Sequence, residues 1–164
     1  MDLFDYNAFA CSRLTIRNYI TSFSMAVRLL NKDYRLPIHA LYGFVRYADE
    51  IVDTLHQHNK QILLEKFSND TFEAIRSKVS INPILHSFQY LVNNYKIEDE
   101  HIRAFFYSME MDLGQKQYSG ELYTKYIYGS AEVVGLMCLR IFYRNDDESY
   151  ENLKPYARKL GEDF

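Results

Sequence analysis

Four polar side chains recur along one face of an otherwise apolar segment in the first third of the chain. Tyr42, Arg46, Asp49 and Asp53 follow the spacing i, i+4, i+7 and i+11, which places them on one stripe of a helix. Carboxylates four residues apart on a helix repel each other unless a cation lies beside them. Mg²⁺ suits this position because it prefers oxygen ligands and completes its coordination with water and phosphate oxygens. The stripe is therefore compatible with Asp49 and Asp53 as metal ligands, with Mn²⁺ as the alternative ion, although the spacing alone is weak evidence for such a site.

A simpler interpretation of the same stripe stays open. Arg46 and Asp49 are three residues apart, a spacing at which an ion pair forms on a helix surface. In that case both carboxylates face solvent and bind no metal.

The elements that must position this stripe are helical nearly throughout. Apolar residues recur with helical spacing, and no alternating strand pattern occurs. Pro37 fits the first turn of a helix, the polar run 144–149 predicts a loop, and Pro155 is expected near the start of a last helical stretch. The other expected helices span residues 6–17, 19–30, 37–56, 59–78, 83–95, 98–117 and 121–143. We expect an all-α bundle and a single helical domain over 1–164.

Composition narrows the classes of function. With a net charge of −3, the chain lacks the positive charge that a nucleic-acid binder needs to neutralise phosphates. Nucleic acid is therefore not expected as a partner. No leader with a basic and an apolar region occurs, and no membrane-spanning run, so we expect a cytoplasmic protein. A separate expectation is peripheral contact with a membrane, where the product would be released. Cys11 and Cys138 are expected to be packed thiols, and the five histidines show no zinc-binding pattern.

Three ordered blocks resemble the squalene/phytoene synthase family. Arg35 to Asp53 resembles the first aspartate-rich signature of that family. Thr21 to Ala26, ahead of Leu29-Leu30, is similar to its Ser-Phe element. Met111-Asp112-Leu113, with Tyr126 to Met137, resembles its second block.

The resemblance implies an isoprenoid synthase-type bundle and a prenyltransferase of the phytoene or squalene synthase type. Such an enzyme condenses two geranylgeranyl or farnesyl diphosphates head to head in carotenoid or related terpenoid biosynthesis, with Mg²⁺ and without NADPH for this chain. By resemblance, the catalytic residues are Asp49, Asp53, Arg46 and Tyr42, and Arg46, Tyr42 and Ser22 steady the diphosphate. The implied substrate-binding residues are Ser22, Phe23, Val27, Tyr126, Ala131, Val134 and Cys138.

Two departures accompany the resemblance. Glu132 stands where many relatives carry Gly. Asp112, which is not a departure, has two open interpretations: it adds polar chemistry in the centre, or it pairs with Lys116 four residues on. Lys159-Leu160-Gly161 resembles the start of the second aspartate-rich helix, but the chain ends before the rest of that motif. We therefore expect a bundle truncated before that helix, and a fragment without turnover.

The expected truncation also predicts exposed apolar surface and a homo-oligomer that buries it. That surface is expected around Val27, Phe44, Ala131, Val134 and Cys138. Two alternatives remain: a class I terpene cyclase-like enzyme, and a non-catalytic helical oligomerisation module. Metal-dependent diphosphate binding would distinguish an enzyme from the module.

Overall fold

The structure is a computed structural model that describes residues 1–19, 21–114 and 120–162, and their side chains except those of 19, 21–24 and 160–162. Over these residues the chain is helical without strands, which confirms the all-α prediction. The elements are α1 (Leu3–Tyr19), α2 (Thr21–Leu29), α3 (Lys32–Asp53), α4 (Lys60–Ser77), α5 (Pro83–Tyr95), α6 (Asp99–Gly114), α7 (Glu121–Ile127), the π-helix η1 (Tyr128–Glu132), α8 (Val133–Phe142) and α9 (Asp147–Glu162).

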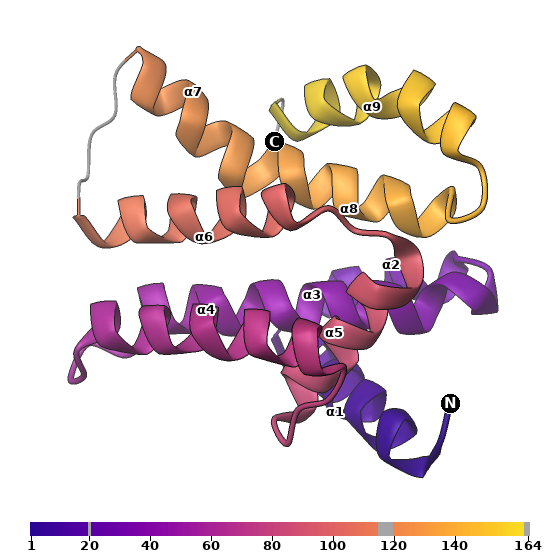
Figure 1. Cartoon of the computed structure of the whole chain (residues 1–164), viewed down its shortest axis with the longest axis horizontal. Coiled ribbons are helices and arrows are strands. Elements are labelled where there is room, and N and C mark those ends of the chain that lie inside the picture. The colour runs from indigo at the N-terminus through magenta and orange to yellow at the C-terminus, as the bar shows by residue number, and fades with distance from the viewer. Residues whose placement is uncertain (20, 115–119, 163–164) are drawn as a thin grey trace.

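The helices form two adjoining groups (Figure 1). Helices α1, α3, α4 and α5 pack on one another, while α6, η1, α8 and α9 form the second group. Helix α3 contacts both groups, because it also packs on α6 and α8. The stripe on α3 is therefore placed where the two groups meet.

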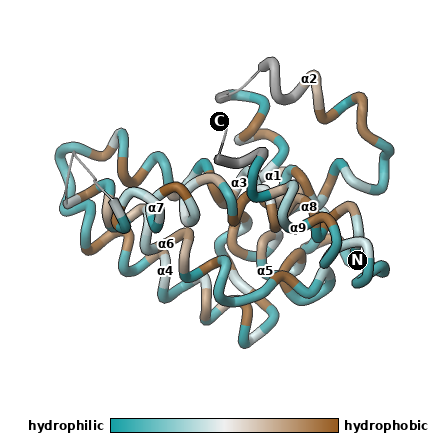
Figure 2. The backbone as a smooth tube through the Cα atoms, turned by 90° about the horizontal axis from the view of Figure 1, so that it is seen from above, coloured by the Kyte–Doolittle hydropathy of each residue, from teal (hydrophilic) through white to brown (hydrophobic). Residues whose placement is uncertain are grey.

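Aromatic rings fill the space around α3. Phe44 is fully buried and stacks on Phe88 of α5, with the two ring centroids 3.7 Å apart. Phe67, Phe105 and Phe106 surround the same ring from α4 and α6. Apolar stretches of α3, α5 and α8 gather towards the middle of the bundle (Figure 2). Burial of these rings stabilises α3 by the hydrophobic effect and by specific aromatic contacts.

The prediction of exposed surface at Val27 and Phe44 is wrong. Phe44 is 0% exposed and Val27 is 2% exposed. The rings from α4, α5 and α6 cover Phe44, so its environment is ordinary core. The prediction of a packed Cys11 is also wrong, since Cys11 is exposed, whereas Cys138 is half-buried.

Two helix starts differ from the sequence prediction by more than one helical turn. Helix α3 begins at Lys32, because the Asn31 side chain accepts a hydrogen bond from the Asp33 amide, and Pro37 lies inside the helix. Helix α9 begins at Asp147, because the Asp146 carboxylate accepts from the Ser149 amide at 3.0 Å. The predicted loop over 144–149 is therefore shorter, and Pro155 also lies inside a helix.

The predicted helix 121–143 is interrupted in its middle. Residues Tyr128–Glu132 form a π-helix between α7 and α8. Such insertions often occur at functional sites, because they re-aim the side chains that follow them. The predicted helix 98–117 ends as α6 at Gly114, and its last residues lie outside the described ones.

None of the described helices is both long enough and apolar enough to span a membrane.

Candidate active site

An acidic cleft lies at the C-terminal half of α3. Asp49 and Asp53 from α3 face Asp112 of α6 and Tyr126 of α7 across a space of about 480 Å³. Val45, Val52, Phe105, Met109 and Ser130 complete the lining. The structure thus brings the two predicted metal ligands together with Asp112 and Tyr126.

Burial and mutual repulsion perturb two carboxylates of this acidic cleft, those of Asp49 and Asp112. Desolvation raises the pKa of Asp49 to about 6; Arg46 opposes the rise, and the charges of Asp53, Asp112 and Glu50 add to it. Desolvation also raises the pKa of Asp112, which Tyr126 partly offsets by hydrogen bonding. Such a cluster of carboxylates favours a bound cation, because a cation would relieve both the repulsion and the desolvation.

Arg46 does not simply neutralise Asp49. Its guanidinium donates to the Glu50 carboxylate one turn further on, while the distance to the Asp49 carboxylate is 4.0 Å. Arg46 is not among the residues that line the acidic cleft. The simple Arg46–Asp49 pair is therefore at most a weak interaction, and both aspartates remain directed at the cleft.

The π-helix supplies the opposite wall. The Tyr126 hydroxyl donates to the Asp112 carboxylate at 3.4 Å, and the Ser130 hydroxyl donates to the Tyr126 carbonyl at 2.9 Å. The first of these contacts connects the end of α7 to α6, and the second ties Ser130 of the π-helix to Tyr126. Asp112 is therefore oriented by Tyr126, while the predicted alternative partner Lys116 lies outside the described residues.

An apolar groove continues from the acidic cleft. Its volume is about 690 Å³, and it shares Val45 and Ser130 with the cleft. The predicted substrate-binding residues Ala131, Val134 and Cys138 line it, together with Tyr42. The remaining lining residues are Gly135, Leu139, Phe142, Tyr143, Leu153, Tyr156 and Ala157. Tyr42, predicted beside the aspartates, thus lies in the groove and not in the cleft.

Two weakly acidic groups face each other in the apolar groove. The Cys138 thiol donates to the Tyr42 hydroxyl at 3.9 Å. Desolvation raises the pKa of Cys138 to about 11 and also raises that of Tyr42, so both groups are neutral at physiological pH. The groove is therefore uncharged along this wall.

Helix α9 covers one side of the apolar groove. Arg158 donates from Nε to the buried Glu132 carboxylate at 2.5 Å, and a Cβ on Gly135 would stand 3.1 Å from the Ala157 carbonyl. The resemblance of Lys159 to Gly161 to a family motif did not predict this role of α9. The spacing of Leu153, Tyr156 and Ala157, at i, i+3 and i+4, was the available signal.

The other predicted substrate residues are placed elsewhere. Val27 lines a separate pocket with cationic side chains and does not reach the apolar groove. Ser22 and Phe23 belong to α2, but their side chains lie outside the described ones.

The acidic cleft fits a cation that brings ligands of its own. Among the described residues, no three His, Cys, Asp or Glu side chains form a ready metal cage. Mg²⁺ commonly takes only one or two carboxylates and fills its other positions with water and substrate phosphate oxygens. Asp49 and Asp53 meet that requirement.

Comparison with known proteins identifies the family. The family described as Squalene/phytoene synthase matches residues 16–164, which cover most of the chain. The chain belongs to this family. A curated member, the 4,4'-diapophytoene synthase of Staphylococcus haemolyticus (strain JCSC1435), is 26% identical over 156 residues, which are 90% of this chain and 51% of the relative. The chain spans about half the length of this curated relative.

Solved structures of two proteins share the fold. A dehydrosqualene synthase in complex with ligand matches with a TM-score of 0.82 and 24% identity, over 96% of this chain and 54% of that one. The squalene synthase HpnC from Alicyclobacillus acidocaldarius matches with a TM-score of 0.82 and 19% identity, over 98% of this chain and 60% of that one. The all-α fold of the isoprenoid synthase type is thereby confirmed.

Proposed function

We propose that this chain forms the metal- and diphosphate-binding part of a head-to-head isoprenoid synthase, a prenyltransferase that condenses two farnesyl or geranylgeranyl diphosphates. The reaction would serve carotenoid or related terpenoid biosynthesis. One observation carries the proposal: the acidic cleft and the apolar groove share Val45 and Ser130. A carboxylate site for a cation joined to an apolar groove suits a ligand with a diphosphate head and a hydrocarbon tail.

The acidic cleft would act on the diphosphate head. Asp49 and Asp53 would hold Mg²⁺, or Mn²⁺, which when bound neutralises the charge that develops on a departing diphosphate. Asp112 and the Tyr126 hydroxyl complete the polar wall. Arg46 lies beside Asp49 and would turn from Glu50 towards the diphosphate when the negative charge arrives.

The apolar groove would hold the tail and keep water from carbocations. Ala131 and Val134 offer apolar walls, and Tyr156 covers one side from α9. The raised pKa of Cys138 keeps its thiol protonated, which makes it a poor nucleophile towards a carbocation. No residue of this groove suggests a nicotinamide site, and NADPH is not part of the proposal.

Three further expectations stay predictions. They are a homo-oligomer, peripheral contact with a membrane and a cytoplasmic location. Light scattering measures the first, and sedimentation with lipid vesicles measures the second.

The decisive experiment measures binding of farnesyl S-thiolodiphosphate, an analogue that resists ionisation, with Mg²⁺ and with EDTA. We expect Mg²⁺ to strengthen binding at least tenfold, and Asp49→Asn with Asp53→Asn to remove that gain. Asp70→Asn is the matched control, because Asp70 is an exposed helical aspartate paired with Lys66.

The alternatives give different results. Two results would favour a non-catalytic oligomerisation module. One is an affinity of the wild type for the analogue that is the same with Mg²⁺ and with EDTA. The other is equal affinity of the Asp49/Asp53 and Asp70 variants in the presence of Mg²⁺. Class I terpene cyclase chemistry would instead release cyclic products from a single diphosphate.

A further inference from the structure

A second pocket lies at the other end of α3 and has the opposite charge. Its cationic lining comes from α1, α2 and α3 and consists of Arg13, Arg17, Arg28, Lys32 and Arg35. No acidic residue is among the described residues that line it. We call this space of about 460 Å³ the cationic pocket. The whole chain carries a net charge of −3, so this concentration of positive charge is local.

The cationic pocket is separate from the candidate active site. It shares no lining residue with the acidic cleft or the apolar groove. His39 and Asp49 are ten residues apart on α3, which corresponds to about 15 Å along a helix axis. The two ends of α3 therefore offer two sites of opposite charge.

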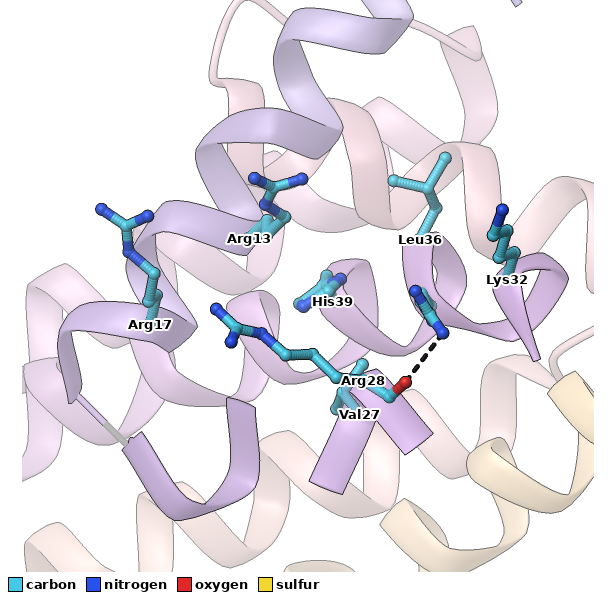
Figure 3. Close-up of a pocket in the computed structure, with 8 residues that line it drawn as sticks. Arg13, Arg17, Val27, Arg28, Lys32, Leu36 and His39 are labelled. Carbon is cyan, nitrogen blue, oxygen red and sulfur yellow. Dashed lines mark hydrogen bonds between the residues drawn. The ribbon is translucent and has the colours of Figure 1, made fainter. Parts of the chain in front are cut away.

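His39 forms the buried part of the cationic pocket. It is 8% exposed, its Nδ1 atom makes no hydrogen bond of ordinary geometry, and the ring lies amid Arg13, Arg17 and Arg28 in Figure 3. Among the described residues, the Arg35 carbonyl is the only group near enough to act as a hydrogen-bond partner for the ring, and a buried polar atom with such a poor partner leaves its desolvation largely uncompensated. Burial lowers the pKa of His39, the charges of Arg13 and Arg35 lower it further, and the nearby Arg35 carbonyl opposes them.

The corner between α2 and α3 holds the cations in place. Arg35 donates from Nε to the Leu30 carbonyl at 3.0 Å and from a terminal nitrogen to the Arg28 carbonyl at 2.7 Å. The dashed line in Figure 3 ends on that Arg28 carbonyl. These contacts fix the backbone of Leu30 and Arg28 beside Arg35, although like charges in one pocket repel each other. A bound anion would remove that repulsion.

We propose that the cationic pocket binds a phosphate-bearing anion, and that inorganic diphosphate is the free anion that fits it best. Diphosphate carries several negative charges and many acceptor oxygens, which match several guanidinium groups better than a single phosphate does. Protonated His39 would donate to the anion from the floor while the rim cations pair with its oxygens. The same chemistry is found in a phospholipid headgroup. This binding needs no metal and does not depend on the proposed reaction.

Calorimetric titration with inorganic diphosphate in EDTA and low salt tests the proposal on the whole chain. We expect saturable binding, weakened about tenfold by Arg13→Gln or Arg28→Gln, because each removes charge-assisted hydrogen bonds. Lys66→Gln is the control for net charge, since Lys66 is an exposed cation on α4, and it should leave binding unchanged. In side-chain NMR titrations, the pKa of His39 should rise when diphosphate is bound.

A parallel arm uses vesicles of phosphatidylglycerol and of phosphatidylcholine. Binding of anionic vesicles alone, lost with Arg13→Gln and Arg28→Gln, would support the proposal and assign the phosphate to a lipid headgroup. Saturable binding of free diphosphate with the same dependence would support it and assign a free anion. If neither ligand binds, or if Lys66→Gln weakens binding as much as the pocket variants, the proposal is overturned. Loss of Mg²⁺-dependent farnesyl analogue binding in Arg13→Gln would also overturn it, because the pocket would then belong to the active site.

Discussion

Gly129 of the π-helix lies against the Ala104 carbonyl of α6 so closely that a Cβ at residue 129 would stand 2.3 Å from that oxygen. A real Cβ cannot occupy that position, so only glycine permits this approach. The contact joins α6, which carries Asp112, to the π-helix that carries Ser130. It therefore holds the helix that carries Asp112 close to the wall that carries Ser130.

Replacing Gly129 by alanine should separate the two helices. We expect Gly129→Ala to lower the free energy of unfolding by about 2 kcal/mol, a typical cost of overpacking. Gly114→Ala is the control, because a Cβ there would meet no atom within 4 Å. It should be neutral or slightly stabilising, since alanine favours helix. Urea denaturation of both variants measures this; equal stability losses would contradict the close approach.

The affinity for Mg²⁺ should depend on pH through Asp49. Its raised pKa, about 6, means that the folded protein holds this proton more tightly than the unfolded chain does. The stability that the shift contributes is present below the unfolded pKa of 3.8 and is lost as pH rises through about 6. Mg²⁺ needs the ionised carboxylate, so its affinity should increase over the same interval and level off above it.

Thermal unfolding with and without Mg²⁺ over this pH range tests the expectation. The stabilisation by Mg²⁺ should grow with pH in the wild type and in Asp70→Asn. In Asp49→Asn it should be small at every pH. A pH-independent effect of Mg²⁺ in the wild type would show that Asp49 is not a ligand.

The ion pair between Glu132 and Arg158 should hold α9 over the apolar groove. Arg158→Gln leaves the buried Glu132 carboxylate without its charged partner, and we expect a loss of about 2 kcal/mol of unfolding free energy. Adding Glu132→Gln should restore much of that loss, because the buried charge is then gone. Denaturation of the single and double variants measures the coupling. Additive losses would show that the pair does not act as a unit.

The apolar groove should select ligands by tail length. Ala131→Phe places a ring in the groove, and we expect it to weaken binding of a geranylgeranyl analogue more than that of a farnesyl analogue. Ala26→Phe is a suitable control, because Ala26 is exposed on α2 and lies outside the groove. Titration of both analogues into each variant, with Mg²⁺ present, measures the difference. An equal loss for both tails would mean that the ligand does not reach Ala131.

The 164-residue chain should bind diphosphates without condensing them. The described carboxylates of the acidic cleft come from α3 and α6 alone, and Asp49 and Asp53 are the only pair assigned to hold a metal ion. Ionisation of an allylic diphosphate needs charge stabilisation around the whole leaving group. Product assays with farnesyl and geranylgeranyl diphosphate test this, and hydrocarbon product from this chain would overturn it.

The sequence by itself determined the helical class and the stripe that contains the two candidate ligands. Helical periodicity places Asp49 and Asp53 on one face regardless of the rest of the fold, because only local backbone geometry is involved. The same periodicity placed Tyr42 on that face. It could not show that Tyr42 belongs to another pocket, although eleven residues correspond to about 16 Å along the axis.

Only the tertiary structure decided which elements meet at this face. The position of Val27 depends on the corner that Arg35 fixes between α2 and α3, and that corner is made by backbone carbonyls without a sequence signature. The burial of Phe44 depends on rings from three other helices. Asp112 joins Asp49 because α6 packs on α3 and the π-helix. Each of these relationships links distant parts of the chain, so packing, and not local propensity, determined it.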